Sequence, residues 1–185
     1  MFGVFDRFGY LHRSLLWRRA GDVPLRQIGG VGAPTWSWTA FEGAIDYLDI
    51  SPLEVEWNTN ISFNTSTAQA PVLMAPVMEF EINEMLHDQS LLVLDVQRAA
   101  NVRNIRCVMV GKQERSSGGE EDLVCYVLVV SPMQSTKTPQ TPQTPQTTQT
   151  TQTTQTELKF ERLGVATIRK AHIAIERGSV EGRLI

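Results

Sequence analysis

Trp36 and Trp38 have the most distinctive type and spacing in the chain, because the two indoles alternate with Ser37. Residues two apart lie on the same face of a β-strand, so the sequence predicts both indoles on one side of a strand. Two aromatic rings placed in this way can stack on sugar rings or bind a partner peptide, but more often they anchor a hydrophobic core. We therefore consider Trp36, Trp38 and Trp17 as residues for either interaction or core anchoring.

Paired carboxylates are the second candidate. Glu54 and Glu56 alternate with apolar residues, as do Glu79 and Glu81. Two acids on one face serve in glycoside hydrolysis, although such a face is more often simply solvated. The chain has no Gly-x-Ser-x-Gly elbow, and the glycine-rich segment 29–34 neither follows a strand nor opens a helix, which disfavours a phosphate cradle. We expect no catalytic residue and predict that the chain is not an enzyme.

The histidines and cysteines are dispersed along the chain. His12, His87 and His172 lack the spacing of metal ligands on a helix or a zinc knuckle. Cys107 and Cys125 each lie in an apolar, strand-like run. The sequence therefore predicts no metal and no cofactor, and it predicts two buried free thiols, with pairing across strands as the alternative.

The composition restricts the partners. The 185 residues carry a net charge of −3, whereas a nucleic-acid-binding surface needs an excess of Lys and Arg. No apolar run approaches the roughly 20 residues that cross a bilayer. Residues 1–10 lack the apolar core of a secretory signal. We expect a cytoplasmic chain that binds neither nucleic acid nor membrane, so the N-glycosylation motifs at Asn60 and Asn64 are interpreted as chance matches.

Residues 138–156 contain only Thr, Gln and Pro. Such a segment has no apolar side chain to bury and does not offset the entropy lost on ordering, so we expect it to be disordered. Its strict three-residue period is interpreted as an expanded repeat in a surface loop; a linker, a glycosylated stalk and a glutamine-rich assembly segment are the alternatives. Loop-closure entropy grows slowly with length, so we expect a single β-rich domain over residues 1–185 that this loop interrupts.

Strand patterns dominate the rest of the chain. Residues 12–19 (HRSLLWRR) favour one short helix. Alternating or continuously apolar segments predict strands at 53–57, 78–82, 91–94, 105–110, 123–130, 160–168 and 171–175. About eight strands at hairpin spacing, without helices between them, predict a mainly β fold: an antiparallel sheet, a sandwich or an open barrel with one short N-terminal helix.

Several blocks resemble a known family. The block from Ala33 to Ala40 (APTWSWTA), followed by Glu42-Gly43, is similar to a Trp-Ser-Trp block of fungal heterokaryon incompatibility proteins. Residues 15–18 (LLWR) resemble the element that precedes this block in the family, and residues 125–128 (CYVL) and 160–165 (FERLGV) resemble two of its late strands. The order and rough spacing of these blocks agree along nearly the whole chain.

The resemblance implies a C-terminal accessory region of such a protein, from a filamentous ascomycete. The chain departs from the pattern at Thr39-Ala40, and it has no counterpart of the heterokaryon incompatibility (HET) domain to which cell-death signalling is attributed. No effector residue is therefore carried over, and the expected function is a non-enzymatic interaction module with an unknown protein partner. The alternatives are a carbohydrate-binding or glycoside-processing β-domain, or a truncated fragment without a selected function.

Overall fold

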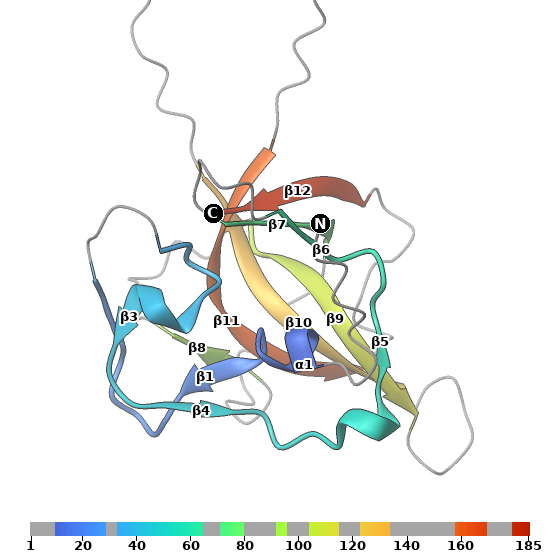
Figure 1. Cartoon of the computed structure of the whole chain (residues 1–185), viewed down its shortest axis with the longest axis horizontal. Helices are drawn as coiled ribbons and strands as arrows, with labels where there is room; N and C mark the ends of the chain where they lie inside the picture. Colours follow the sequence, from blue (N-terminus) through green and yellow to red (C-terminus); the bar gives the residue numbers. More distant parts are fainter. Residues whose placement is uncertain are drawn as a thin grey trace, which may run out of the picture.

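The computed structural model describes residues 10–28, 33–64, 71–79, 92–95, 104–114, 123–133, 158–169 and 179–185. The chain is mainly β, as predicted (Figure 1). Its short helices are α1 (Tyr10–Arg13) and the 3-10 helices η1 (Trp38–Ala40) and η2 (Pro52–Glu54). Its strands are β1 (Trp17–Arg19), β2 (Arg26–Gln27), β3 (Phe41–Glu42), β4 (Ile45–Tyr47), β5 (Glu56–Trp57), β6 (Ser62–Asn64), β7 (Val72–Glu79), β8 (Leu92–Leu94), β9 (Arg106–Glu114), β10 (Leu123–Pro132), β11 (Leu158–Arg169) and β12 (Val180–Leu184).

Five strands close into a small barrel. They pair in the order β7–β9–β10–β11–β12, and β12 pairs with β7 to complete the ring. In a closed ring with an odd number of strands at least one neighbouring pair must be parallel, and here that pair is β11 with β12. β5 extends the sheet beside β9, β6 beside β7, and β8 beside β11. The predicted antiparallel architecture is therefore confirmed, with one parallel pair that closes it.

Both faces of the barrel wall are buried. One core cluster receives side chains from all five ring strands, including Leu73, Val108, Leu128 and Leu184, so it fills the barrel interior. A second cluster, which includes Val127, lies on the opposite face of β9, β10 and β11. Strands buried on both sides are continuously apolar rather than alternating, which explains the run Leu123–Val130.

Residues 15–28 and 33–50 form a second layer beside the barrel. β1 pairs with β4, and β2 pairs with β3, in two small antiparallel sheets (Figure 1). Trp17, Leu25, Ala40 and Phe41 make the small core of this layer. The neighbouring side chains of Leu15 and Leu16 instead join the cluster inside the barrel. The N-terminal layer and the barrel therefore share a continuous apolar interface.

The Thr/Gln/Pro tract joins two strands that pair with each other. β10 and β11 run antiparallel, and Pro132 lies opposite Phe160. The Met133 amide also donates to the carbonyl of Lys159, at 2.9 Å. Residues 138–156 themselves lie outside the described residues.

Three local predictions are wrong. The helix expected over residues 12–19 stops at Arg13, and Trp17–Arg19 forms β1 because its backbone pairs with β4. Residues 53–57 are not one strand, since η2 precedes the two-residue β5. Trp36 and Trp38 are not on a strand; Trp36 lies in a turn and Trp38 begins η1. In each case tertiary contacts prevail over a short local pattern.

The other strand predictions agree with the structure where it describes them. β8 covers residues 92–94 of the segment predicted at 91–94, and β9 covers residues 106–110 of the segment predicted at 105–110. β10 and β11 contain the segments predicted at 123–130 and 160–168. Residues 80–82, 91 and 171–175 lie outside the described residues. Cys107 and Cys125 are buried thiols that form no disulfide, as predicted, and burial raises the pKa of the Cys107 thiol to about 12.

Candidate functional site

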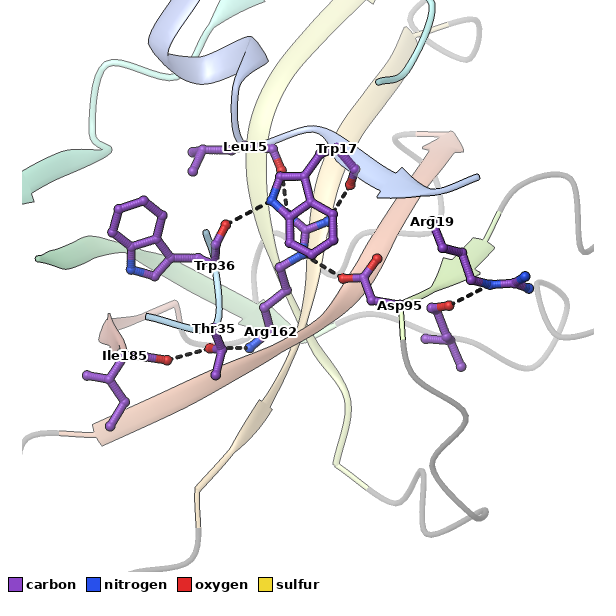
Figure 2. Close-up of polar contacts among 9 residues, drawn as sticks. Leu15, Trp17, Arg19, Thr35, Trp36, Asp95, Arg162 and Ile185 are labelled. Carbon is purple, nitrogen blue, oxygen red and sulfur yellow. Dashed lines mark hydrogen bonds and ion pairs between the residues drawn. The ribbon is translucent and has the colours of Figure 1, made fainter. Parts of the chain in front are cut away.

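A buried arginine joins the sequence blocks that are far apart in the chain. Arg162, on β11, is 2% exposed. Its Nε donates to Asp95 Oδ2 at 2.7 Å, its Nη1 donates to the carbonyl of Leu15 at 2.6 Å, and its Nη2 donates to the carbonyl of Trp17 (Figure 2). One side chain therefore ties β11 to the backbone on both sides of Leu16 and to the residue that follows β8.

An aromatic ring completes the surroundings of this guanidinium. The Cζ atom of Arg162 lies 3.5 Å from the centre of the Trp17 ring, within the range of a cation–π interaction. The Trp17 Nε1 donates to the carbonyl of Trp36 at 3.0 Å, and its ring packs on Phe41 at 5.3 Å between centroids. Trp17 is fully buried.

Burial dominates the electrostatics of the Arg162–Asp95 pair. Desolvation raises the pKa of Asp95, and the charge and hydrogen bond of Arg162 and the charge of Arg19 oppose this rise. Desolvation also lowers the pKa of Arg162, against the charge and hydrogen bond of Asp95. Asp95 Oδ1 has no hydrogen-bond partner within the described part of the chain. The attraction and the hydrogen bond between the two side chains must therefore compensate for the large free-energy cost of removing both charges from water.

Thr35 provides a hydrogen-bond partner for the edge of β11 next to this pair. β11 pairs with β12 at Leu158–Phe160 and with β8 at Gly164–Ala166, which leaves a gap between them. The Arg162 amide fills the gap by donating to Thr35 Oγ1 at 3.2 Å, and Thr35 Oγ1 in turn donates to the carbonyl of Ile185 (Figure 2). A hydroxyl that both accepts and donates is suited to this position.

The rest of the Trp-Ser-Trp block is used to hold this segment. The Ser37 amide donates to the carbonyl of Pro34 at 2.9 Å, and the Ser37 side chain caps η1. Trp36 packs its ring against Phe63 at 5.8 Å between centroids. Gly43 has φ +139°, and a Cβ there would lie 2.6 Å from Leu25 Cδ2, so the block requires glycine at its end.

Trp38 is the exception within the block, because its side chain is 48% exposed. The three predicted site tryptophans are thus placed differently: Trp17 is in the core, Trp36 is partly buried against the barrel cluster, and Trp38 faces solvent. The shared face expected for Trp36 and Trp38 is therefore absent. The Trp36 Nε1 is buried and has no hydrogen-bond partner among the described residues.

The remaining candidates are engaged locally. Glu56 pairs with Lys112 at 2.9 Å, Glu79 pairs with Arg106, and Glu54 accepts from Gln113 at 2.8 Å. Glu81, His87 and His172 lie outside the described residues. His12 lies 2.9 Å from the carbonyl of Asn58 through its Nε2 and stacks on Trp57.

In the part of the chain that the structure describes, no three His, Cys, Asp or Glu residues are placed to hold a metal ion. No described helix is long and apolar enough to cross a membrane.

Sequence reasoning missed Arg162, Asp95 and Thr35. One signal was present: Arg162 lies two residues after Phe160 on a predicted strand, so alternation assigns it to the same, inward face. Asp95 directly follows the apolar run 91–94, but a charged residue in that position normally marks the end of a strand at the surface. Thr35 gave no signal, because its partners are more than a hundred residues away.

Comparisons with known proteins add no assignment. No protein-family model matches the chain, and neither a curated protein nor a solved structure is significantly similar to it.

Proposed function

We propose that this chain is a non-enzymatic, cytoplasmic protein-interaction module related to the region that follows the HET domain in fungal heterokaryon incompatibility proteins, and that Trp38 is its contact residue. The observation that carries the proposal is the exposure of Trp38 directly after three residues whose side chains serve the fold. Thr35, Trp36 and Ser37 are each engaged by an internal hydrogen bond or ring contact.

Hydrogen bonds and strand pairing hold the chain in place before and after Trp38, which supports a role in binding. The chain enters η1 from Thr35, which is bonded to Arg162 and Ile185, and leaves it through β3, which pairs with β2. A large aromatic side chain on a rigid frame loses little entropy on binding, and tryptophan is enriched among the residues that dominate interface affinity. An exposed indole in such a position is therefore a good anchor for a partner.

The carbohydrate alternative loses its original basis. It relied on two indoles that share a face, whereas Trp36 packs on Phe63 and only Trp38 is exposed. Of the paired acids that it also relied on, Glu56 and Glu79 form ion pairs with Lys112 and Arg106. We therefore favour a protein partner for the Trp38 surface.

The test compares Trp38→Ala with Leu53→Ala as immobilised bait in extracts of a filamentous ascomycete. Leu53 is a matched control because it is an exposed apolar side chain, 83% accessible, outside the block. We expect one or more proteins to be retained by the wild type and by Leu53→Ala and to be reduced at least tenfold on Trp38→Ala, as quantified by mass spectrometry.

Thermal melts of both variants separate binding from folding. Trp38→Ala should unfold within a few degrees of the wild type, because it leaves no cavity in the core. Equal capture by all three proteins, or a large loss of stability in Trp38→Ala, would overturn the proposal.

A further inference from the structure

A small pocket lies at the edge of the sheet, away from the Trp38 segment. It forms between β9 and the turn that follows β5, and it has a volume of about 220 Å³. Trp57 and Met109 provide apolar walls, and Thr59 and Asn60 lie at its solvent-exposed rim. Pockets for drug-sized ligands enclose roughly 300–1,000 Å³, so this one suits a ligand of a single ring.

The aromatic wall is held in place. Trp57 Nε1 donates to the carbonyl of Pro52 at 3.2 Å, and His12 stacks on the indole at 5.8 Å between centroids. Gly111 lies opposite Trp57 across the β5–β9 pair, and a Cβ there would lie 3.0 Å from Trp57 Cε3. The absence of a side chain at Gly111 lets the indole settle against β9.

The polar turn is also fixed, but two of its side chains are free. Asn58 Nδ2 donates to the carbonyl of Met109 at 2.7 Å, and Asn58 Oδ1 accepts from the Asn60 amide at 3.0 Å. The Thr59 hydroxyl and the Asn60 carboxamide make no hydrogen bond within the described residues. Together they present donors and acceptors to a ligand on a preformed turn.

The charges in the pocket compensate each other. Glu56 and Lys112, which lie side by side across β5 and β9, form an ion pair at 2.9 Å. No other charged side chain lines the pocket among the described residues. A paired rim of this kind offers no net attraction to an anion or a cation, so the ligand that fits is uncharged.

We propose that this pocket binds one ring of a neutral, hydroxyl-rich ligand, the size of a single sugar unit. The ring lies against Trp57 and Met109, and its hydroxyls bond to Thr59 and Asn60. An aromatic wall and a few polar groups on a rigid turn are what such a ligand requires. This inference rests on different residues from the Trp38 surface and does not depend on the proposed function.

The test is a titration of the ¹⁵N-labelled full chain, followed by two-dimensional NMR. The probes are the methyl glycosides of glucose, mannose, galactose and N-acetylglucosamine, each up to about 50 mM, because a shallow site of this size binds in the millimolar range. We expect at least one probe to cause saturable shifts at residues 56–60 and 109–112, including the Asn60 side-chain amide and the Trp57 indole.

Variants identify the polar contacts. Asn60→Ala combined with Thr59→Ala removes the free donors and acceptors, and we expect at least a tenfold weaker affinity with an otherwise unchanged spectrum. Gln27→Ala is the matched control, since it removes an exposed carboxamide on β2. Glycerol at the same concentration separates ring recognition from a general response to polyols. No saturable shift with any probe, shifts elsewhere only, an equal response to glycerol, or equal affinity in the double variant would each overturn the proposal.

Discussion

Arg162 shows how one buried charge can organise a fold of short elements. In place of hydrogen bonds to water, its guanidinium makes hydrogen bonds to Asp95 and to two backbone carbonyls, and it lies over the face of the Trp17 ring. These partners come from the residue that follows β8 and from the chain around β1, so both segments must assemble on β11 for the charge to be buried. A buried ion pair adds little net stability relative to apolar packing, but removing one partner leaves the other uncompensated. Its contribution is therefore to specify one arrangement of these segments.

Arg162→Met tests this contribution. We expect it to lower the free energy of unfolding by about 3–5 kcal/mol, since the Asp95 carboxylate is left buried and unpaired. Urea denaturation measures the change. Arg26→Met is the control, because Arg26 pairs with Glu42 at the surface, where Arg26 is 78% exposed and the loss is under about 1 kcal/mol. Comparable losses in the two variants would contradict an organising role for Arg162.

The block from Ala33 to Gly43 acts as a strap at the scale of elements. It holds the open edge of β11 through Thr35, holds Trp17 through the carbonyl of Trp36, and contributes η1 and β3 to the N-terminal layer. Its apolar contacts are made by Trp36 with Phe63 and by Ala40 and Phe41 in the small core of that layer. Polar contacts with residues that are distant in the sequence add to them.

Thr35→Val isolates the polar part of this strap. Valine keeps the size of threonine but removes the hydroxyl, which leaves the Arg162 amide and the Ile185 carbonyl without this partner. We expect a loss of about 1–3 kcal/mol in the free energy of unfolding, measured by urea denaturation. Thr59→Val, at an exposed threonine outside the strap, should change stability by under about 0.5 kcal/mol. A neutral Thr35→Val would show that the strap is held by packing alone.

An element could be predicted from the sequence when its partners lie close to it along the chain, and could not when its partners are distant. β9, β10 and β11 are consecutive antiparallel strands, and their apolar runs were sufficient to predict them. The strap was not predictable, because the period-two pattern of Trp36 and Trp38 gives no sign that Thr35 bonds to β11. Simple alternation also fails within β11. Because Leu163 forms a bulge, Arg162 and Val165 both point to the inner face of β11. Val165 joins the core cluster inside the barrel, and Arg162 reaches the carbonyl of Leu15.

At the scale of the whole molecule, closure of the barrel depends on β12. This strand contains Gly182 and Arg183 and lacks a clear apolar pattern, so the sequence did not predict it. Its partners are the beginning of β11, in parallel, and β7, more than a hundred residues earlier. The mainly β class could be predicted from local patterns, whereas the ring required these long-range pairings.

The β10–β11 hairpin gives the last prediction at this scale. Met133 and Lys159 hold the base of the loop, and β10 and β11 are paired over their lengths. If residues 134–157 only close a loop, replacing them with a four-residue turn shortens the loop roughly sixfold and should stabilise the fold by about 1.5 kcal/mol.

Urea denaturation measures the gain, with a reversed sequence of residues 138–156 as a control of unchanged length and composition. Reversal should be neutral, because loop-closure entropy depends on length and not on order. A loss of stability in the shortened chain, or in the reversed one, would mean that the tract packs against the barrel.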